Sequence, residues 1–328
     1  MNIPPAEYTL VNPDPLRDFI TQAFIKVEMP IEQAAFLADL LVTNDLRGVF
    51  SHGTVQTLRY VTLFRNNDLT PTPTISTISE TPTTLVLDGG GGLGYFPCYQ
   101  ATQAIIEKAK KCGIAVATTR NHGHFGAAGI YARLPLAHGL FCYVTSGHQL
   151  NLHPGDFVMS AAGGSPMAFG IPTGEEPPFV LDFGAIHDMY LGYDAMKPIV
   201  EMVPSTVLRS FGLGCACQAL GGLLCGVPLD ADKAARQWSG ANQGSFIIVV
   251  DIKALYPIEQ FTQEMDEYAR RVRQCRPFPG IAQALMPGAI ESQREQKAVQ
   301  EGIRIAPPHA SSLQKLAAML ALPYPLEV

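Results

Sequence analysis

Short segments rich in β-branched and aromatic residues alternate with helical patterns through the middle of the chain. Residues of these types favour strands, and the segments lie at 84–88, 114–118, 140–145, 179–182 and 246–251. Amphipathic patterns at 100–111 and 127–134 separate the first three of them. Strands that alternate with helices bury their apolar faces against those helices, so the chain is predicted to contain an α/β layer.

Helical patterns flank this layer on both sides. Apolar residues recur at spacings of three and four in 14–27 and 31–43. A third helix is expected to start at Ser51, whose hydroxyl would cap it. From residue 258 the pattern is helical again, and a last helix is expected at 311–320.

The stretch 69–84 is dense in Thr and Pro and predicts an extended linker. We therefore expect a helical segment at 1–75, an α/β domain at 76–255 and a second helical segment at 256–328. This last segment is expected to pack on the N-terminal helices, so that the two helical segments form one discontinuous domain.

Charge and hydropathy argue against two classes of partner. The chain carries 23 basic and 29 acidic residues, a formal net charge of −6, and no Lys/Arg block, so nucleic acid is not an expected partner. No apolar run is long enough to span a membrane, and 211–228 predicts a buried helix.

The seven cysteines form no C-x-x-C pair and no secretory signal pattern precedes them, so we expect reduced thiols in a cytoplasmic protein.

A glycine run follows the first predicted strand. Gly89, Gly91 and Gly94 match G-x-G-x-x-G, a pattern that binds dinucleotide phosphates through backbone N–H groups when it joins a strand to a helix. No acidic residue ends the next predicted strand, as that fingerprint requires. A wide turn with left-handed glycines is the favoured interpretation, and a dinucleotide fingerprint is the alternative.

Two histidine-containing loops carry candidate chemistry, and the first joins two predicted helices. Arg47, Ser51 and His52 lie within six residues of one another, where a short turn can aim all three side chains into one cavity. The alternative interpretation is a capping serine followed by a solvated histidine.

The second loop follows a predicted strand, at the end where α/β proteins commonly bind ligands. His122 and His124 could also bind zinc there, with His148, His153 or His187 as a third ligand. These spacings match no metal-binding pattern, so no metal is expected.

The first loop carries the motif Asp-Leu-Arg-Gly-x-x-Ser-His-Gly at 45–53, and the second carries Asn-x-x-His-Phe-Gly at 121–126. Together they resemble the signature of the malate/L-lactate dehydrogenase family, which also includes sulfolactate, ureidoglycolate and diketogulonate dehydrogenases and piperideine-carboxylate reductases. The resemblance covers nearly the whole chain and continues at 86–94, 164–172, 180–182, 287–288 and 301–303.

The resemblance implies a homodimer of two-domain subunits, with a non-Rossmann, mixed-sheet α/β cofactor domain and a discontinuous helical domain. It implies hydride transfer between NAD(P)H and a small 2-oxo or 2-imino acid. By the family pattern His52 is the general acid/base, a role that suits an imidazole with a reference pKa of about 6.5. Arg47 would pair with the substrate carboxylate through both arms of its fork, His124 would bind the substrate oxygen, and Ser51 and Asp182 would orient or polarise the site.

The cofactor, NAD or NADP, is expected at three segments, namely Asp182, Phe183, Gly184, Ala185, Arg209, Ser210, Pro287 and Gly288. This sequence departs from the family pattern there. Residues 183–187 replace a Ser-rich turn, and 204–210 replace the family's Pro-x-Gly-Gly-x-Lys-Gly segment, with Arg209 in place of Lys and Thr206-Val207 in place of Gly-Gly.

Because the acid/base residues match the family and the cofactor segment does not, other functions stay open. A diverged member could catalyse cofactor-independent acid/base chemistry, such as an isomerisation or a lyase step, on a 2-oxo or 2-hydroxy acid. A non-catalytic binding protein is a third interpretation. The redox function is favoured, since similarity over a whole chain preserves the reaction class more often than it changes it.

Overall fold

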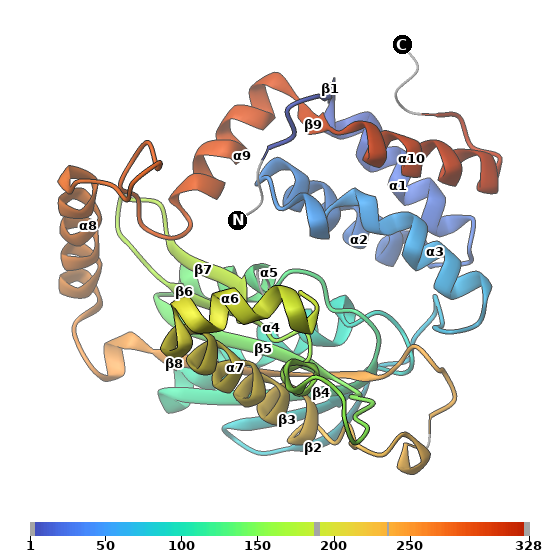
Figure 1. The fold of residues 1–328 in the computed structure, drawn as a ribbon, viewed down its shortest axis with the longest axis horizontal. Helices are drawn as coiled ribbons and strands as arrows, with labels where there is room; N and C mark the ends of the chain where they lie inside the picture. Colours follow the sequence, from blue (N-terminus) through green and yellow to red (C-terminus); the bar gives the residue numbers. More distant parts are fainter. Residues whose placement is uncertain (1–3, 187–190, 235, 325–328) are drawn as a thin grey trace. The chain divides into compact units, whose positions relative to one another are not determined.

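The computed structural model describes residues 4–186, 191–234 and 236–324 (Figure 1). The chain divides into two compact units, one formed by Met1–Pro73 and Gly288–Val328 and the other by Thr74–Pro287. The first unit is mainly helical, and the second contains the main sheet.

A mixed sheet forms the centre of the second unit. Within the described residues its strand order is β2-β3-β4-β8-β5-β6-β7. β3 and β4 are parallel, and the other neighbouring pairs are antiparallel. The strands are β2 (Ser76–Glu80), β3 (Thr84–Asp88), β4 (Ile114–His122), β5 (Leu140–His148), β6 (Pro166–Ile171), β7 (Phe179–Gly184) and β8 (Gln243–Asp251). The predicted α/β class with a mixed, non-Rossmann sheet is confirmed.

The five strands predicted in this unit are all present, and two more were missed. β6 begins at a proline, and β2 lies inside the stretch 69–84 that we predicted to be a linker. All five residues of β2 are exposed, and β2 pairs only with β3 at the edge of the sheet. An edge strand with no buried residue shows no hydrophobic alternation, which is why the linker prediction was wrong for 76–80.

Helices cover the two faces of this sheet. Cys142 Sγ contacts the carbonyl of Tyr131 in α5 (Ala128–Arg133), and the next residue, Tyr143, directs its hydroxyl to Cys217 Sγ in α7 (Pro204–Gln218). Successive strand residues point to opposite faces, so α5 and α7 lie on opposite sides. α4 (Tyr95–Cys112) lies on the α5 side, since Cys98 contacts Ser245 of β8.

The helical prediction for 211–228 was partly wrong. α7 already begins at Pro204, continues as a π-helical turn at Ala219–Leu223 and is preceded by α6 (Tyr193–Met202). Leu213 and Leu224 are exposed, because only one side of this segment packs on the sheet. None of the described helices is long and apolar enough to cross a membrane.

α8 (Ile258–Gln274) belongs to the α/β unit, although we placed the end of that domain at residue 255. The Asp266 carboxylate of α8 accepts hydrogen bonds from the backbone N–H groups of Gly174, Glu175 and Glu176. These bonds tie the helix to the β6–β7 connection. The compact division therefore falls after Pro287.

The helical unit combines both ends of the chain. Its helices are α1 (Pro13–Ile25), α2 (Ile31–Leu46), α3 (Thr57–Arg65), α9 (Ala289–Glu301) and α10 (Pro307–Leu320). α9 packs on α2, α10 packs on α3, and β1 (Thr9–Val11) pairs with β9 (Ile303–Ile305). Leu16, Leu37, Leu41 and Leu316 are among the fully buried side chains.

Strand register brings several candidate residues to one end of the main sheet. Asp88 pairs with Arg120, and Gln243 at the start of β8 pairs with both His122 and His148. At the far edge Pro166 pairs with Gly184. β3, β4, β5 and β7 therefore all terminate at the same end of the sheet.

Candidate functional site

Arg47 is the C-cap residue of α2, and its guanidinium is held by a carboxylate of α9. Its Nε lies 2.9 Å from Glu295 Oε2, with side chains 22% and 32% exposed. This contact uses Nε, the inner nitrogen of the guanidinium. The two terminal nitrogens can still bind a second carboxylate in bidentate fashion.

Ser51 and His52 lie in the short 3₁₀ turn η1 (Phe50–His52). Ser51 Oγ is 2.9 Å from His52 Nδ1. The amides of Asn44 and Gln56 donate to the carbonyls of His52 and Ser51, at 2.8 and 2.7 Å. Side-chain contacts thus fix this turn and pin the imidazole at Nδ1.

The predicted capping role of Ser51 was wrong. A second 3₁₀ turn, η2 (Thr54–Gln56), follows η1, and α3 begins only at Thr57. No side chain caps the start of η1, η2 or α3. The hydroxyl of Ser51 is directed to the neighbouring imidazole instead.

A series of hydrogen bonds between buried polar side chains stabilises the loop that contains Ser51 and His52. Asp45 Oδ2 accepts hydrogen bonds from the N–H and hydroxyl of Thr54, at 2.9 and 2.6 Å, and the same hydroxyl is 2.9 Å from His309 Nε2. Burial raises the pKa of Asp45 to about 7 and lowers that of His309 to about 4. Gly53 is required, because a Cβ there would lie 1.8 Å from Asp45 Oδ1.

Sequence reasoning gave no role to Asp45, Glu295 or His309. One signal for Asp45 was available, since it continues the apolar stripe of α2 that contains Leu41 and Val42. A carboxylate on a buried stripe is rare unless it is partnered. Glu295 and His309 stand far along the chain and carried no local signal.

The second histidine loop is braced by the glycine run. Gly94 N–H donates to the carbonyl of His124, and Gly91 N–H donates to that of Asn121, at 3.0 and 2.9 Å. Gly91 has a φ of 79°, in the left-handed region. The glycines form the wide turn favoured from the sequence, and the N–H groups of Gly91 and Gly94 are used by this loop. His124 itself is half-buried.

His122 is a structural residue. It is fully buried, with Nε2 2.8 Å from Thr119 Oγ1 and Nδ1 2.7 Å from the carbonyl of Gly123. Burial lowers its pKa to about 4, so the imidazole is neutral at pH 7. Across 4–186, 191–234 and 236–324, no three His, Cys, Asp or Glu side chains gather as a metal site. His187, considered as a zinc ligand, lies outside the described residues.

Asp182 lies near the end of β7, on the α5 side of the sheet. Its Oδ2 accepts a hydrogen bond of 2.8 Å from the N–H of Gly129, at the start of α5. The close approach requires glycine, since a Cβ there would lie 2.7 Å from Oδ2.

The predicted cofactor residues at the end of β7 pack near α7 through an apolar cluster. Ala185 belongs to a buried apolar cluster against which Phe183 and Phe211 pack. Arg209 and Ser210 precede Phe211 in α7. Arg209 is exposed.

The segment that replaces the family's Gly-Gly turn is helical. The N–H groups of Thr206 and Val207 both donate to the carbonyl of Val203, at 3.0 and 3.2 Å. Their amides are therefore used inside the first turn of α7. The Pro287 carbonyl accepts a hydrogen bond of 3.1 Å from Val180 N–H, and Gly288 starts α9 with a φ of 95°.

The structure thus groups the predicted residues in two sets. Arg47, Ser51, His52 and Gly288 belong to the helical unit. Asp182, Phe183, Gly184, Ala185, Arg209, Ser210, Pro287 and His124 belong to the α/β unit.

Comparisons of the sequence and of the structure with known proteins find the same kind of protein. The family model for malate/L-lactate dehydrogenase matches residues 11–185 and 194–314. The malate dehydrogenase of Pyrococcus horikoshii is 27% identical, with 83% of this chain and 84% of that protein covered. The L-sulfolactate dehydrogenase of Methanocaldococcus jannaschii is 26% identical (88% and 91% covered), and the NAD(+) ureidoglycolate dehydrogenase of Escherichia coli is 22% identical (90% and 92% covered). A solved malate dehydrogenase structure from P. horikoshii superposes with a TM-score of 0.82 at 25% identity, covering 98% of both chains.

Proposed function

The chain belongs to the malate/L-lactate dehydrogenase family, and from this premise we propose that it is an NAD(P)-dependent oxidoreductase that acts on a small 2-oxo or 2-imino acid and its reduced product. Relatives that act as malate, sulfolactate and ureidoglycolate dehydrogenases support this reaction type. The resemblance inferred from the sequence is confirmed at the level of the family.

The observation that carries the proposal is the arrangement of Arg47, Ser51 and His52 in one loop. Ser51 fixes the imidazole of His52 through Nδ1, which assigns proton exchange with the substrate oxygen to Nε2. An imidazole can take up or release a proton near pH 7. Arg47 pairs with the substrate carboxylate through its terminal nitrogens while Glu295 holds Nε.

His124 and Asp182 of the α/β unit have roles in this proposal through the family resemblance. His124 binds the substrate oxygen, and its loop is held by the backbone bonds to the glycine run. Asp182 is fixed by Gly129 N–H and orients the reacting groups. Neither role requires a metal ion.

In this proposal most of the residues that would hold the cofactor belong to the α/β unit, and the charge of Arg209 replaces the backbone contacts of the family's Gly-Gly turn. Asp182 to Ala185, Arg209, Ser210, Pro287 and Gly288 would hold it, and NAD or NADP, when bound, supplies or accepts the hydride. Two observations favour this fit. Arg209 offers an exposed guanidinium in α7, and Ser165 has a buried hydroxyl with no hydrogen-bond partner among the described residues.

Assembly and compartment belong to the same proposal. A homodimer follows from the family resemblance, and light scattering at micromolar concentration would test it, with a monomer as the contrary result. The seven cysteines, all in the described ranges, are free thiols, which supports a reducing, cytoplasmic environment.

One observation favours a second candidate function. Because the N–H groups of Thr206 and Val207 are bonded within α7, they cannot cradle a pyrophosphate. Cofactor-independent isomerase or lyase chemistry at His52 would need no such cradle. Titration of the protein with NADH and NADPH, followed by nicotinamide fluorescence, separates the two: saturable binding supports the dehydrogenase, and no binding at millimolar cofactor supports the second candidate.

A further inference from the structure

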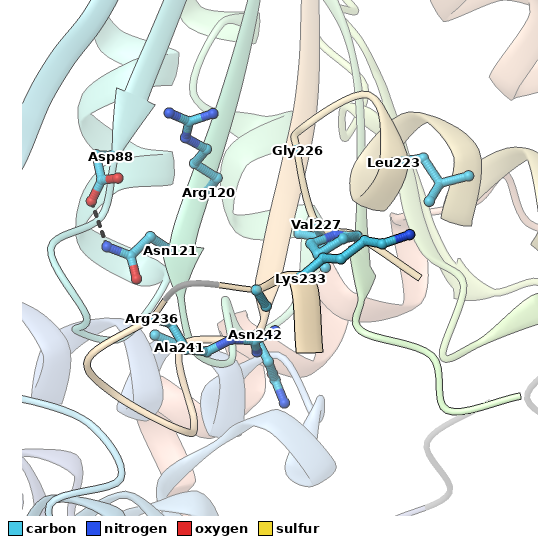
Figure 2. Close-up of a pocket in the computed structure, with 12 residues that line it drawn as sticks. Asp88, Arg120, Asn121, Leu223, Gly226, Val227, Lys233, Arg236, Ala241 and Asn242 are labelled. Carbon is cyan, nitrogen blue, oxygen red and sulfur yellow. Dashed lines mark hydrogen bonds between the residues drawn. The ribbon is translucent and has the colours of Figure 1, made fainter. Parts of the chain in front are cut away.

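A cavity of about 510 Å³ opens in the α/β unit, at the end of the sheet where β3 and β4 terminate (Figure 2). Its polar lining comes from three segments distant in sequence. The groups used below are Asp88, Arg120, Asn121, Lys233, Arg236 and Asn242. A volume of this size is typical of small-molecule sites.

The cavity lies on the opposite face of the sheet from Asp182, the face on which α7 packs. Residues paired across neighbouring strands share a face of the sheet. From Asp182 in β7, successive cross-strand pairs run through Ala168 in β6, Val144 in β5 and Ile247 in β8 to Ala117 in β4. All five side chains therefore lie on one face of the sheet. Arg120 is three residues beyond Ala117 and so points to the other face. β4 and β7 are also four strand spacings apart, roughly 19 Å at 4.8 Å each.

Positive charge dominates the cavity lining. The lining contains Arg120, Lys233 and Arg236 and one carboxylate, Asp88. Asp88 Oδ1 already accepts hydrogen bonds from Gly90 N–H at 2.9 Å and Asn121 Nδ2 at 2.7 Å, and Figure 2 shows the second of these. Asp88 therefore positions the Asn121 amide.

The two arginines have no carboxylate partner among the residues that the structure describes. Lys233 is only loosely paired, with Nζ 3.5 Å from Asp230 Oδ2. Arg120 and Arg236 are both half-buried, and burial lowers the pKa of the Arg236 guanidinium. A guanidinium stays protonated at neutral pH, so each is a partly desolvated cation without an ion-pair partner in the described part of the chain. Bound anionic oxygens would offset that cost.

We propose that this cavity, lined by Arg120 and Arg236, binds a small dianion of the phosphate-ester or dicarboxylate class. The two arginines, neither of which has an ion-pair partner within the described ranges, supply two positive charges for the two negative charges of the ligand. Guanidinium forks suit planar or tetrahedral oxyanions. The amides of Asn121 and Asn242 can bind the uncharged part of the ligand. This inference does not depend on the dehydrogenase activity.

Calorimetric titration of the full chain at low ionic strength tests the proposal. The probes are inorganic phosphate, succinate, 2′-AMP and 5′-AMP, against the native protein and the Arg120→Met, Arg236→Met and Arg276→Met variants. Arg276 is exposed in the same unit and outside the cavity, so Arg276→Met is the matched control. Thermal unfolding of each variant confirms that it is folded.

We expect at least one dianion to bind the native protein, and each cavity variant to weaken it tenfold or more while Arg276→Met leaves it unchanged. Preference for 2′-AMP over 5′-AMP would identify the 2′-phosphate of NADP as the source, and binding of phosphate or succinate alone would identify a separate small ligand. No binding by any probe, or equal affinity in folded Arg236→Met and native protein, would overturn the proposal. Arg236 lies in a loop between η7 (Ala231–Lys233) and β8, so its replacement spares the sheet.

Discussion

Arg47 Nε lies 2.9 Å from Glu295 Oε2, a contact that joins α2 to α9 across 248 residues of sequence. The carboxylate holds the inner nitrogen of the fork and leaves the outer edge to a substrate. Glu295 is thus a positioning residue for Arg47 in the proposed mechanism.

Glu295→Gln keeps a hydrogen-bond acceptor for Nε but removes the charge. A partly exposed pair of this kind contributes about 1 kcal/mol, so we expect KM for the 2-oxo acid to rise about fivefold with little change in kcat. Steady-state kinetics measures the split between the two constants. Asp39→Asn, which alters the pair with Arg17 in the same unit, is the control and should leave both constants unchanged.

Arg47→Lys preserves the charge and loses the planar fork. An ammonium cannot bind a carboxylate through two parallel N–H groups. We expect KM to rise about tenfold to a hundredfold, from a loss of roughly 1.4–3 kcal/mol for a charge-assisted pair. If the lysine variant keeps the native KM, Arg47 does not bind the substrate carboxylate.

His52→Ala removes the proposed general acid/base. We expect kcat to fall by about 10²–10⁴-fold, while the unfolding midpoint stays within a few degrees because the side chain is only half-buried. His138→Ala replaces an exposed histidine of the α/β unit and should retain full activity. Native turnover in folded His52→Ala protein would remove this residue from the mechanism.

The buried Asp45 carboxyl gives a prediction about stability and pH. Its pKa is about 7 in the folded protein, against an ordinary value of 3.8. Between these values the unfolded chain releases the proton and the folded chain keeps it, so the stability that Asp45 contributes is present at low pH and is lost as pH rises through about 7. A shift of about three pKa units corresponds to roughly 4 kcal/mol.

Asp45→Asn cannot titrate and keeps one oxygen that can accept from Thr54. We expect the free energy of unfolding of the native protein, relative to this variant, to fall by up to about 4 kcal/mol between pH 4 and pH 7.5. Denaturant unfolding at several pH values measures it. His122 and His309, whose pKa values are lowered to about 4, titrate in both proteins and largely cancel. Parallel curves would show that Asp45 is ionised in the folded state throughout.

The sequence predicted those parts of the fold whose signal is local. Segments such as 84–88 and 246–251 are buried on at least one face and show it in their residue types. β2 could not be predicted, because its pairing with β3 at an exposed edge leaves no pattern in its own residues. α7 was misplaced because Thr206 and Val207 are poor helix formers, and the helix is set by packing of Phe211 and Cys217.

In the candidate site, too, residues in local motifs could be predicted, whereas their partners far along the chain could not. Arg47, Ser51, His52 and His124 were found because they lie in short motifs. The contacts that hold them come from elsewhere in the chain, as in the pair formed by Thr54 and His309, 255 residues apart. Only the folded chain shows that the hydroxyl of Ser51 is directed to His52 rather than to a helix end.

Transfer of deuterium from the cofactor to the substrate tests the central claim most directly. The protein is incubated with NADH or NADPH deuterated at C4 of the nicotinamide, in separate experiments with each C4 isotopomer, and with a panel of 2-oxo acids that includes oxaloacetate. Mass spectrometry of the product then locates the label. The proposed function predicts a 2-hydroxy acid carrying one deuterium at C2, formed by the native protein and not by His52→Ala. A product formed from a 2-oxo or 2-hydroxy acid without cofactor label, at a rate independent of NADH and NADPH, would contradict it.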